Sequence, residues 1–204
     1  MENISIAEQK SFLRKRAKEE LKKYFADKAL SLQCAKTVAD YFLKSKEYAE
    51  AKVIFAYMAM SDEIDLSFVI NKALQDKKQI ALPRMAENSN DMDFYFIDSL
   101  ENSFSDDNKY KILEPSLQNK KVEPEKIPEK SVFLVPGLAF NLEGSRLGRG
   151  KGYYDKYLSR IPEKNQRFCG VCTVNVVTKA IPVEENDFRM NYLLTEYGFI
   201  SLTR

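Results

Sequence analysis

Two short segments, residues 52–58 and 131–135, constrain the fold of this chain more than any other feature. Both are almost continuously apolar, whereas a strand with one face in water alternates apolar and polar side chains. Strands of this kind are typical of parallel sheets that are buried on both faces by helices. The two segments therefore predict an α/β protein.

Helical and strand-like patterns alternate around these two segments, which favours right-handed crossovers between parallel strands. We predict helices at residues 7–25, 31–43, 63–75 and 155–160, and further strands at 79–83, 93–97, 168–174 and 192–195. The strand at 79–83 should stop at its proline, and residues 114–130, with three prolines and many charges, should form a surface loop. The chain has 204 residues and shows no internal repeat, so one domain over residues 1–204 is expected.

The sequence contains no histidine, which excludes imidazole-based zinc sites, Ser-His-Asp chemistry and a histidine general base. Its three cysteines are too few for a disulfide framework. Cys169 and Cys172 have the spacing of a redox or metal half-site, but in a strand they would point to opposite faces, so packing is the favoured interpretation. Any chemistry must use carboxylates, lysine, arginine, tyrosine, backbone amides or a bound metal.

The charge balance and the absence of long apolar runs bear on partners and location. The net charge is +2, which does not by itself indicate a nucleic-acid partner. The first residues lack a signal-peptide core, and no apolar run approaches the length that spans a bilayer. We expect a cytoplasmic protein without a nucleic-acid or membrane partner, and a monomer rather than an oligomer.

Four of the seven glycines, Gly144, Gly148, Gly150 and Gly152, fall within nine residues. Glycine destabilises regular elements, so this crowding predicts a loop whose backbone passes close to a ligand. Three cations are interleaved with these glycines: Arg146, Arg149 and Lys151. The loop follows a buried strand and leads into a helix, which indicates a site for a polyanion such as a triphosphate. The alternative is a flexible basic surface loop.

Asp155 follows this loop and is open to two interpretations. A carboxylate beside a polyphosphate would be repelled unless a divalent cation lay between them, and magnesium is held by one or two carboxylates together with phosphate oxygens. Alternatively, Asp155 is an N-cap or first-turn residue of the following helix. Its position in the sequence does not decide between the two.

The glycine-rich segment, together with shorter motifs, resembles the signature of the 5-formyltetrahydrofolate cyclo-ligases, also called methenyltetrahydrofolate synthetases. The matching segments are residues 135–140 and 144–155, Lys10-x-x-x-Arg14, Met58-x-x-x-Asp62-Glu63-Ile64, Leu82-Pro83-Arg84, Ile112-x-Glu114-Pro115, residues 185–187 and Thr195-Glu196. They occur in order along nearly the whole chain. The glycine-rich stretch is highly specific, whereas the short middle motifs would be weak alone. Many members carry His-Asp where this chain has Asn186-Asp187, so we assign no role to Asn186.

The resemblance implies a single-domain, three-layer αβα sandwich with a mostly parallel central sheet, in which ATP and 5-formyltetrahydrofolate share one cleft. It implies ATP-dependent cyclisation to 5,10-methenyltetrahydrofolate through a phosphorylated formyl intermediate, with Mg2+ as cofactor. The implied ATP-binding residues are Lys10, Arg14, Arg146, Leu147, Gly148, Arg149, Gly150, Lys151, Gly152, Tyr153 and Tyr154, with Arg149 and Lys151 catalytic. The implied folate-binding residues are Met58, Glu63, Arg149, Gly150, Lys151, Gly152, Tyr153 and Tyr154, and the implied metal ligands are Asp155 and Asp187.

Each of these roles has a plainer alternative. Lys10 and Arg14 would more usually be solvated helix charges, Met58 a core residue, and Glu63 a capping residue of the helix predicted after it. One of Tyr153 and Tyr154 should pack inward and the other face the cleft. Two other functional classes also remain: another ATP-using α/β enzyme, such as a small-molecule kinase or a relative of sugar-phosphate isomerases, and a basic RNA-binding module.

Overall fold

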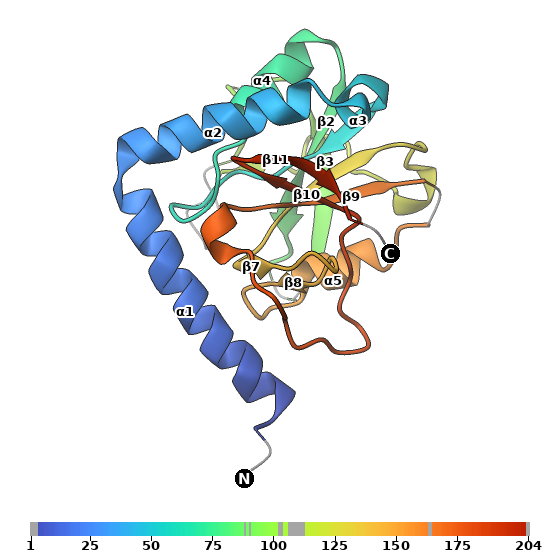
Figure 1. Ribbon diagram of the computed structural model, residues 1–204. Helices are drawn as coiled ribbons and strands as arrows, with labels where there is room; N and C mark the ends of the chain where they lie inside the picture. Colours follow the sequence, from blue (N-terminus) through green and yellow to red (C-terminus); the bar gives the residue numbers. More distant parts are fainter. Residues whose placement is uncertain are drawn as a thin grey trace.

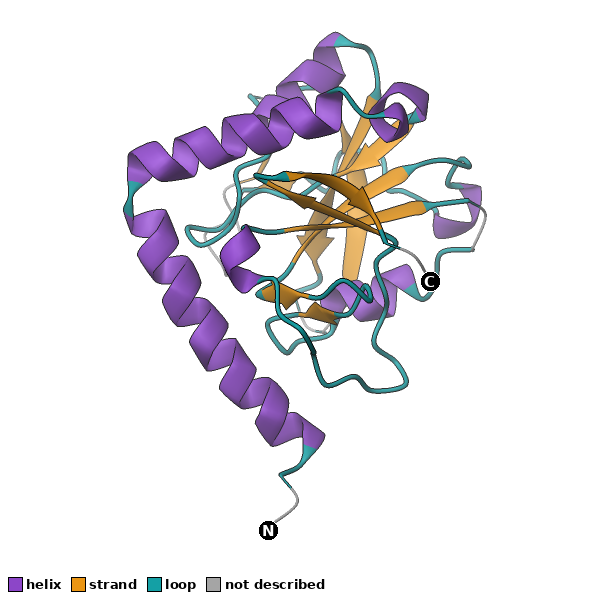
Figure 2. Cartoon of the chain, in the orientation of Figure 1, coloured by secondary structure: helices purple, strands orange, loops and turns teal. Residues whose placement is uncertain are grey.

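The computed structural model describes residues 4–87, 89, 91–101, 104–105, 113–162 and 165–202. A seven-stranded sheet forms the centre of the molecule, and the helices lie outside it (Figures 1 and 2). The strand order is β11-β10-β9-β6-β1-β2-β3. These strands are β1 (Val53–Phe55), β2 (Gln79–Met85), β3 (Met92–Ile97), β6 (Val132–Pro136), β9 (Arg167–Val171), β10 (Tyr192–Thr195) and β11 (Gly198–Ser201).

The five inner strands of the sheet run parallel, and only the two edge strands are antiparallel to their neighbours. β1 pairs in parallel with both β2 and β6, and β9 pairs in parallel with both β6 and β10. β3 and β11 close the two edges through antiparallel pairing. The expectation of an α/β fold with a mostly parallel central sheet is confirmed.

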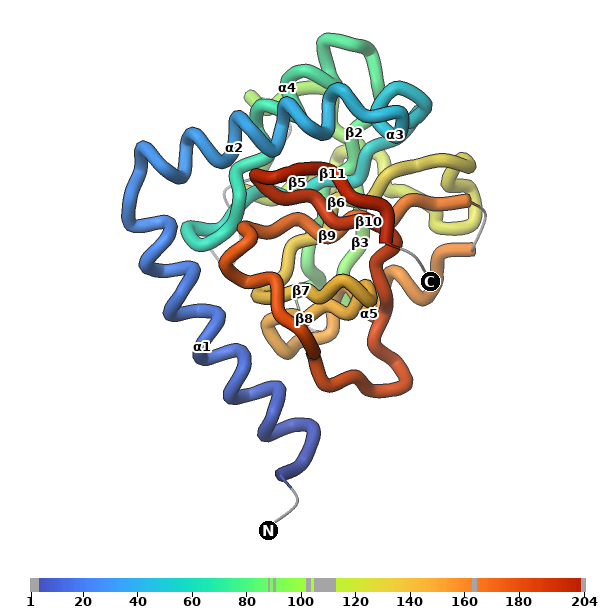
Figure 3. The backbone as a smooth tube through the Cα atoms, in the orientation of Figure 1, coloured from blue at the N-terminus to red at the C-terminus, as the bar shows by residue number. Residues whose placement is uncertain are grey.

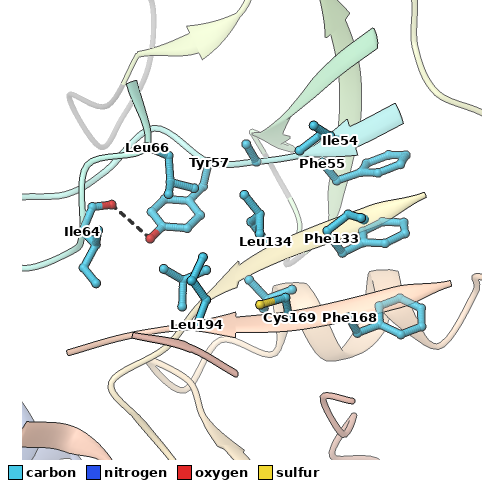
Figure 4. Packing of buried hydrophobic residues seen from close by; sticks show 14 of the residues in the cluster. Ile54, Phe55, Tyr57, Ile64, Leu66, Phe133, Leu134, Phe168, Cys169 and Leu194 are labelled. Carbon is cyan, nitrogen blue, oxygen red and sulfur yellow. Dashed lines mark hydrogen bonds between the residues drawn. The ribbon is translucent and has the colours of Figure 1, made fainter. Parts of the chain in front are cut away.

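A row of phenylalanines covers one face of the sheet. Phe55, Phe133 and Phe168 lie side by side on adjacent strands and are all buried, with ring centroids 4.0 Å and 5.0 Å apart (Figure 4). Helix α5 (Tyr153–Leu158) packs on this face, where its Tyr157 lies 4.8 Å from the ring of Phe94. This single short helix forms one outer layer of the sandwich.

Helices α2 (Lys28–Leu43), α3 (Lys46–Glu50) and α4 (Ser67–Gln75) form the other outer layer. Tyr192 is paired with Cys169 in the register of the sheet, so its side chain lies on the face opposite to that of Phe168. The ring of Tyr192 stacks on Phe199. The ring of Phe42 from α2 lies 6.0 Å from Phe199, which places α2 on this second face. The predicted three-layer arrangement is thus confirmed.

Helix α1 (Ile6–Ala26) leaves the helical layer and runs past the end of the sheet, as the blue segment of Figure 3 shows. It begins with a capping box between Ser5 and Glu8, it contacts both α2 and the 3-10 turn at residues 174–176, and Ala17 and Leu21 in its second half are buried. Its first half therefore extends toward the loops beyond β6. None of the described helices combines the length and apolar composition needed to cross a bilayer.

Two predicted boundaries were wrong for reasons visible in the packing. The strand predicted at 79–83 continues through Pro83 to Met85. Beyond Ala81 it pairs only with β3, so the missing N–H of Pro83 removes no hydrogen bond to β1. The helix predicted at 63–75 begins only at Ser67. The preceding residues form a turn held by Tyr57, whose hydroxyl donates to the carbonyl of Ile64 over 3.1 Å.

The prediction that residues 114–130 form a surface loop is wrong in part. Glu114 is 3% exposed in the short strand β5 (Glu114–Pro115), and the backbone N–H of Val122 donates to Phe94 of β3. A 3-10 turn, η1 (Pro124–Lys126), follows. The prolines and charges that suggested a loop are compatible with a segment that covers the edge of the sheet.

Other short elements had no sequence prediction, namely β4 (Phe104–Ser105), β7 (Ala139–Phe140), β8 (Arg146–Leu147), the 3-10 turn η2 (Val174–Val176) and the edge strand β11. The strand predicted at 168–174 ends at Val171, and the helix predicted at 155–160 spans Tyr153–Leu158. Ile112, quoted in one motif, lies outside the described residues. Cys34, Cys169 and Cys172 are buried and free, as the packing interpretation expected.

Candidate active site

A cleft of about 370 Å3 opens beyond the carboxyl ends of β1, β2 and β6. This is the edge at which ligands bind in open α/β sheets. Every residue assigned to a site from the sequence lines it: Lys10, Arg14, Met58, Glu63, Arg146, Leu147, Gly148, Arg149, Gly150, Lys151, Gly152, Tyr153, Tyr154, Asp155 and Asp187. Segments far apart in sequence are therefore brought to one place.

The glycine-rich segment, residues 144–152, includes part of the β7–β8 turn, the strand β8 and the loop to α5, and it needs glycine at particular positions. Gly144, Gly150 and Gly152 have φ of +83°, +100° and +72°, a region that side chains disfavour. A Cβ on Gly144 would lie 2.2 Å from the carbonyl oxygen of Met190, so the backbone there approaches the 177–191 segment directly. These positive φ angles confirm that the segment has loop conformations at its glycines, whereas its closeness to a ligand stays a prediction.

Arg146 points into the protein and is held by an acid of α5. Its side chain is 5% exposed, its Nη2 donates to Asp155 Oδ2 over 2.8 Å, and its guanidinium lies 5.5 Å from the ring of Tyr154. Gly152 occupies the N-cap of α5, so Asp155 is not the cap, but the alternative placement of Asp155 in the first turn of the helix is confirmed. The other oxygen of Asp155 accepts the backbone N–H of Phe188 over 3.3 Å, which ties α5 to the 177–191 segment.

Lys10 reaches the same segment from α1. Its Nζ donates to Glu184 Oε2 over 2.7 Å and to Asp187 Oδ2 over 2.6 Å. Burial lowers the pKa of Lys10, but the hydrogen bonds to Asp187 and Glu184 outweigh it, so the pKa is raised. Lys10 is only 5% exposed, so its interpretation as a solvated helix charge was wrong. Arg14 lies one turn further along α1 and donates from Nε to the carbonyl of Gly148 over 3.0 Å.

Arg149 crosses the cleft from the glycine-rich loop to the turn after β1. Its Nη2 donates to Asp62 Oδ1 over 2.5 Å and to Glu63 Oε1 over 3.1 Å, and its Nε donates to Glu63 Oε1 over 3.3 Å. Glu63 Oε2 accepts the backbone N–H of Met60 over 3.0 Å. Burial raises the pKa of Glu63 despite the neighbouring arginine. Glu63 is therefore not a helix cap, as one interpretation had it.

The two tyrosines after the loop both line the cleft, but Tyr154 packs further inward. The ring of Tyr154 lies 6.4 Å from Phe94 in an edge arrangement, beneath the guanidinium of Arg146. Burial raises the pKa of the Tyr154 hydroxyl, so this group stays neutral at physiological pH. Lys151 is exposed at the rim, and no hydrogen bond or ion pair to it occurs within the described part of the chain.

Part of the lining of the cleft is apolar. The apolar lining residues include Met58, Met60, Met85, Met92 and Leu113. Flexible thioether side chains adapt well to a flat ring system. Met58 is half-buried, packs against the hydrophobic core and also borders the cleft, so its core interpretation is confirmed in part.

Comparisons with known proteins agree with the family that the sequence motifs resemble. A model of the 5-formyltetrahydrofolate cyclo-ligase family matches residues 6–196. The chain belongs to this family. A 5-formyltetrahydrofolate cyclo-ligase of Mus musculus is 26% identical over 200 residues, which cover 96% of this chain and 98% of the relative. The expectation of an enzyme is thereby confirmed as well.

Solved structures give the same picture at the level of the fold. The NMR structure of the Aquifex aeolicus 5,10-methenyltetrahydrofolate synthetase is 28% identical, covers 96% of this chain and 93% of its own, and aligns with a TM-score of 0.78. A 5,10-methenyltetrahydrofolate synthetase from Mycoplasma pneumoniae shares the fold with a TM-score of 0.67 at 21% identity, covering 92% of this chain and 98% of its own.

The described acids of the cleft do not form a complete protein cage for magnesium. Within the described residues, no group of three or more His, Cys, Asp or Glu side chains is arranged to hold a metal. Asp155 of α5 accepts a hydrogen bond from the backbone N–H of Phe188, the residue after Asp187. The two predicted ligands therefore lie on two segments that contact each other. Magnesium commonly takes only one or two carboxylates and completes its shell with phosphate oxygens and water.

Sequence reasoning missed three acids that border or support the site. Asp62 stands within a quoted motif but received no role, although it binds Arg149. Glu184 pairs with Lys10 across 174 positions of sequence, a distance over which no local pattern gives a signal. Glu114 lines the cleft while its Oε1 accepts the backbone N–H of Met85 over 3.2 Å.

Proposed function

We propose that this chain catalyses the ATP-dependent cyclisation of 5-formyltetrahydrofolate to 5,10-methenyltetrahydrofolate, with release of ADP and phosphate. Membership of the cyclo-ligase family supports the folate chemistry. The observation that carries the ATP-dependent part is the cleft itself, in which a glycine-rich loop with Arg149 and Lys151 faces the turn that bears Glu63. Residues that could bind an anion and residues that could bind a polar ring edge lie within one small volume, which supports the proposal.

In the proposed first step, the formyl oxygen of the substrate attacks the terminal phosphorus of ATP, and ADP departs. Phosphoryl transfer depends mainly on positioning and on neutralising charge, which a site without histidine can supply. Lys10, Arg14 and the loop residues 146–154 would bind the phosphates. Arg149 and Lys151 would offset the charge that develops on the transferred group, and loss of one such contact would raise the barrier by about 3 kcal/mol.

In the proposed second step, the lone pair of the substrate's N10 attacks the formyl carbon, which phosphorylation has made electrophilic. N10 loses its proton, the carbon–oxygen bond breaks, and phosphate leaves with the former formyl oxygen, so that the methenyl cation remains. Holding both ends of the substrate in one cleft favours this ring closure. Glu63 would accept hydrogen bonds from the pterin edge, and Met58, Tyr153 and Tyr154 would contact the folate.

Asp155 and Asp187 would hold magnesium together with the phosphates. The bound ion would neutralise part of the triphosphate charge. The ammonium group of Lys10 donates hydrogen bonds to both Asp187 and Glu184. For Asp187 to bind the ion, Lys10 would have to leave this carboxylate and keep its bond to Glu184 or bind a phosphate. The carboxylate of Asp155 would remain oriented by Arg146.

A direct assay tests the proposed activity. The protein is mixed with 5-formyltetrahydrofolate, ATP and magnesium, and the near-ultraviolet absorbance of the methenyl product is followed. We expect product only when ATP is present. ATP turnover with another acceptor and no methenyl product would indicate a small-molecule kinase, and salt-sensitive RNA binding without nucleotide affinity would indicate an RNA-binding module.

A further inference from the structure

Asp62 and Glu63 both bind the same nitrogen of Arg149, Nη2. The proposed reaction assigns a role to Glu63 but none to Asp62. Arg149 Nη2 stands 2.5 Å from Asp62 and 3.1 Å from Glu63, and Arg149 Nε also donates to Glu63. The side chain of Glu63 is 11% exposed, whereas that of Asp62 is 21% exposed. The arginine is thus held by one buried and one more accessible carboxylate.

The donors that Arg149 directs at Glu63 resemble those of the substrate proposed for this cleft. A guanidinium presents adjacent N–H groups to a carboxylate, and the amino-pyrimidinone edge of a pterin also presents two adjacent N–H donors. Glu63 already uses one oxygen for the backbone of Met60, so it has limited capacity for both. A pterin bound at Glu63 would displace Arg149 at least in part.

Resting on the proposed function, we propose that Asp62 is a positioning residue, which keeps Arg149 in the cleft while the pterin edge replaces the arginine on Glu63. The donors that Arg149 withdraws from Glu63 become available to the transferred phosphoryl group. Folate binding would in this way complete the site for phosphoryl transfer. Asp62 itself touches neither substrate.

The backbone around Arg149 explains why a second anchor is needed. Arg149 stands between Gly148 and Gly150, and Gly150 has φ of +100°. Neither neighbour has a side chain that could fix the loop by packing, and the Arg149 side chain is 31% exposed. Without Asp62, an arginine displaced from Glu63 would have no carboxylate within the described ion pairs to hold it.

The test compares Asp62→Asn with Asp65→Asn, which removes the same charge nearby. Asp65 binds the backbone N–H of Ser67 over 2.8 Å, a bond that an asparagine oxygen preserves, and no contact between Asp65 and Arg149 is present in the described structure. Two quantities are measured for each variant: the affinity for 5-formyltetrahydrofolate, by calorimetry without ATP, and kcat in the complete reaction.

Asp62→Asn should lower both the affinity and kcat by about 10-fold, the effect of losing a charged hydrogen bond. Asp65→Asn should leave both unchanged, and Asp62→Glu should recover at least half of each loss.

Two further readouts distinguish positioning from a purely structural role. In an Arg149→Ala background, Asp62→Asn should change folate affinity by less than about 2-fold, because no guanidinium remains to be placed. The ionisable groups facing Glu63 are Arg149, Asp62, Tyr57 and Tyr154. Because the charge of Asp62 raises the pKa of Glu63, Asp62→Asn should move the acid-side loss of folate binding to lower pH.

Thermal melts show whether the variants fold, and Asp62→Ser provides a second neutral variant if Asp62→Asn does not. The inference is overturned if wild-type protein forms the methenyl product while Asp62→Asn matches it, or if the effect of Asp62→Asn is equally large without Arg149. A wild-type protein that forms no methenyl product would instead refute the proposed function.

Discussion

The basic residues of the cleft are mostly paired with acids in this structure, which bears on how an anion would enter. Arg146 binds Asp155, Lys10 binds Asp187, and Arg149 binds Glu63. A triphosphate would have to share these cations or displace their partners. The residue types at the site were predictable because the glycines and cations stand in one short segment. Their pairings were not, because acids such as Asp187 and Glu63 come from distant positions.

Lys151 is the cation of the loop that an incoming phosphate could reach without breaking an ion pair of the described residues. Lys151→Ala should lower turnover by about 100-fold, because a charged contact to the developing phosphoryl charge is lost. The melting temperature should stay within about 1 °C, since surface substitutions have small effects. Lys156→Ala, on the exposed side of α5, is the matched control and should be neutral. Unchanged kinetics of Lys151→Ala would remove this residue from the site.

Asp155 has both a structural partner and a predicted metal role, and Asp155→Asn can separate them. The amide oxygen still accepts from Arg146 or Phe188, so the loss of stability should be about 1 kcal/mol. Turnover should fall by about 100-fold if the carboxylate also holds magnesium. The checks are a denaturant titration and a magnesium titration of activity. A large loss of stability with magnesium dependence unchanged would make Asp155 only the partner of Arg146.

At the scale of elements, one connection fixes the geometry around the cleft and another joins elements at the opposite end of the sheet. The turn of the β7–β8 hairpin meets the 177–191 segment because Gly144 packs its backbone directly on Met190, and α5 meets the same segment through Asp155. On the far side of the molecule, Glu50 at the end of α3 binds Arg167 of β9 over 2.5 Å and Lys130 over 3.2 Å. The glycine cluster was visible in the sequence, but the partners of each glycine were not.

Two glycine substitutions should separate conformational strain from steric clash. Gly152→Ala places a Cβ where nothing lies within 4 Å, so only its φ of +72° should cost stability, about 1 kcal/mol. Gly144→Ala adds a clash with the carbonyl of Met190 and should cost about 3 kcal/mol. Urea denaturation of both variants measures the difference. Equal losses would mean that the backbone can move away from Met190.

The Glu50 connection should make stability depend on acid pH. The hydrogen bonds from Arg167 and Lys130 lower the pKa of Glu50 to about 2, from 4.5 in an unperturbed glutamate. A carboxylate with a lowered folded-state pKa stabilises the fold above the unfolded pKa and loses that effect as pH falls through the folded one. The urea midpoints of wild type and Glu50→Gln should therefore differ above pH 4.5 and converge toward pH 2. A difference independent of pH would contradict this assignment.

At the scale of the whole molecule, the α/β class and the mostly parallel sheet were predictable from the sequence. The apolar segments around Ile54 and Leu134 could hardly be anything but strands buried on both faces. The edge strand β11 escaped prediction because its burial is partial, so its sequence carries no strong pattern. The turn before α4 was mistaken for helix because its tertiary bonds, such as that of Tyr57, override local propensity. The single-domain extent over residues 1–204, the monomeric state and the cytoplasmic location remain predictions.

The central claim is that the cleft delivers the terminal phosphate of ATP to the formyl oxygen of the substrate. The most direct test uses 5-formyltetrahydrofolate labelled with 18O in the formyl group, together with unlabelled ATP and water, and analyses the released phosphate by mass spectrometry. If the formyl oxygen is phosphorylated and then leaves, one 18O atom should appear in each phosphate formed together with the methenyl product. Unlabelled phosphate, with the isotope recovered in water, would contradict the account.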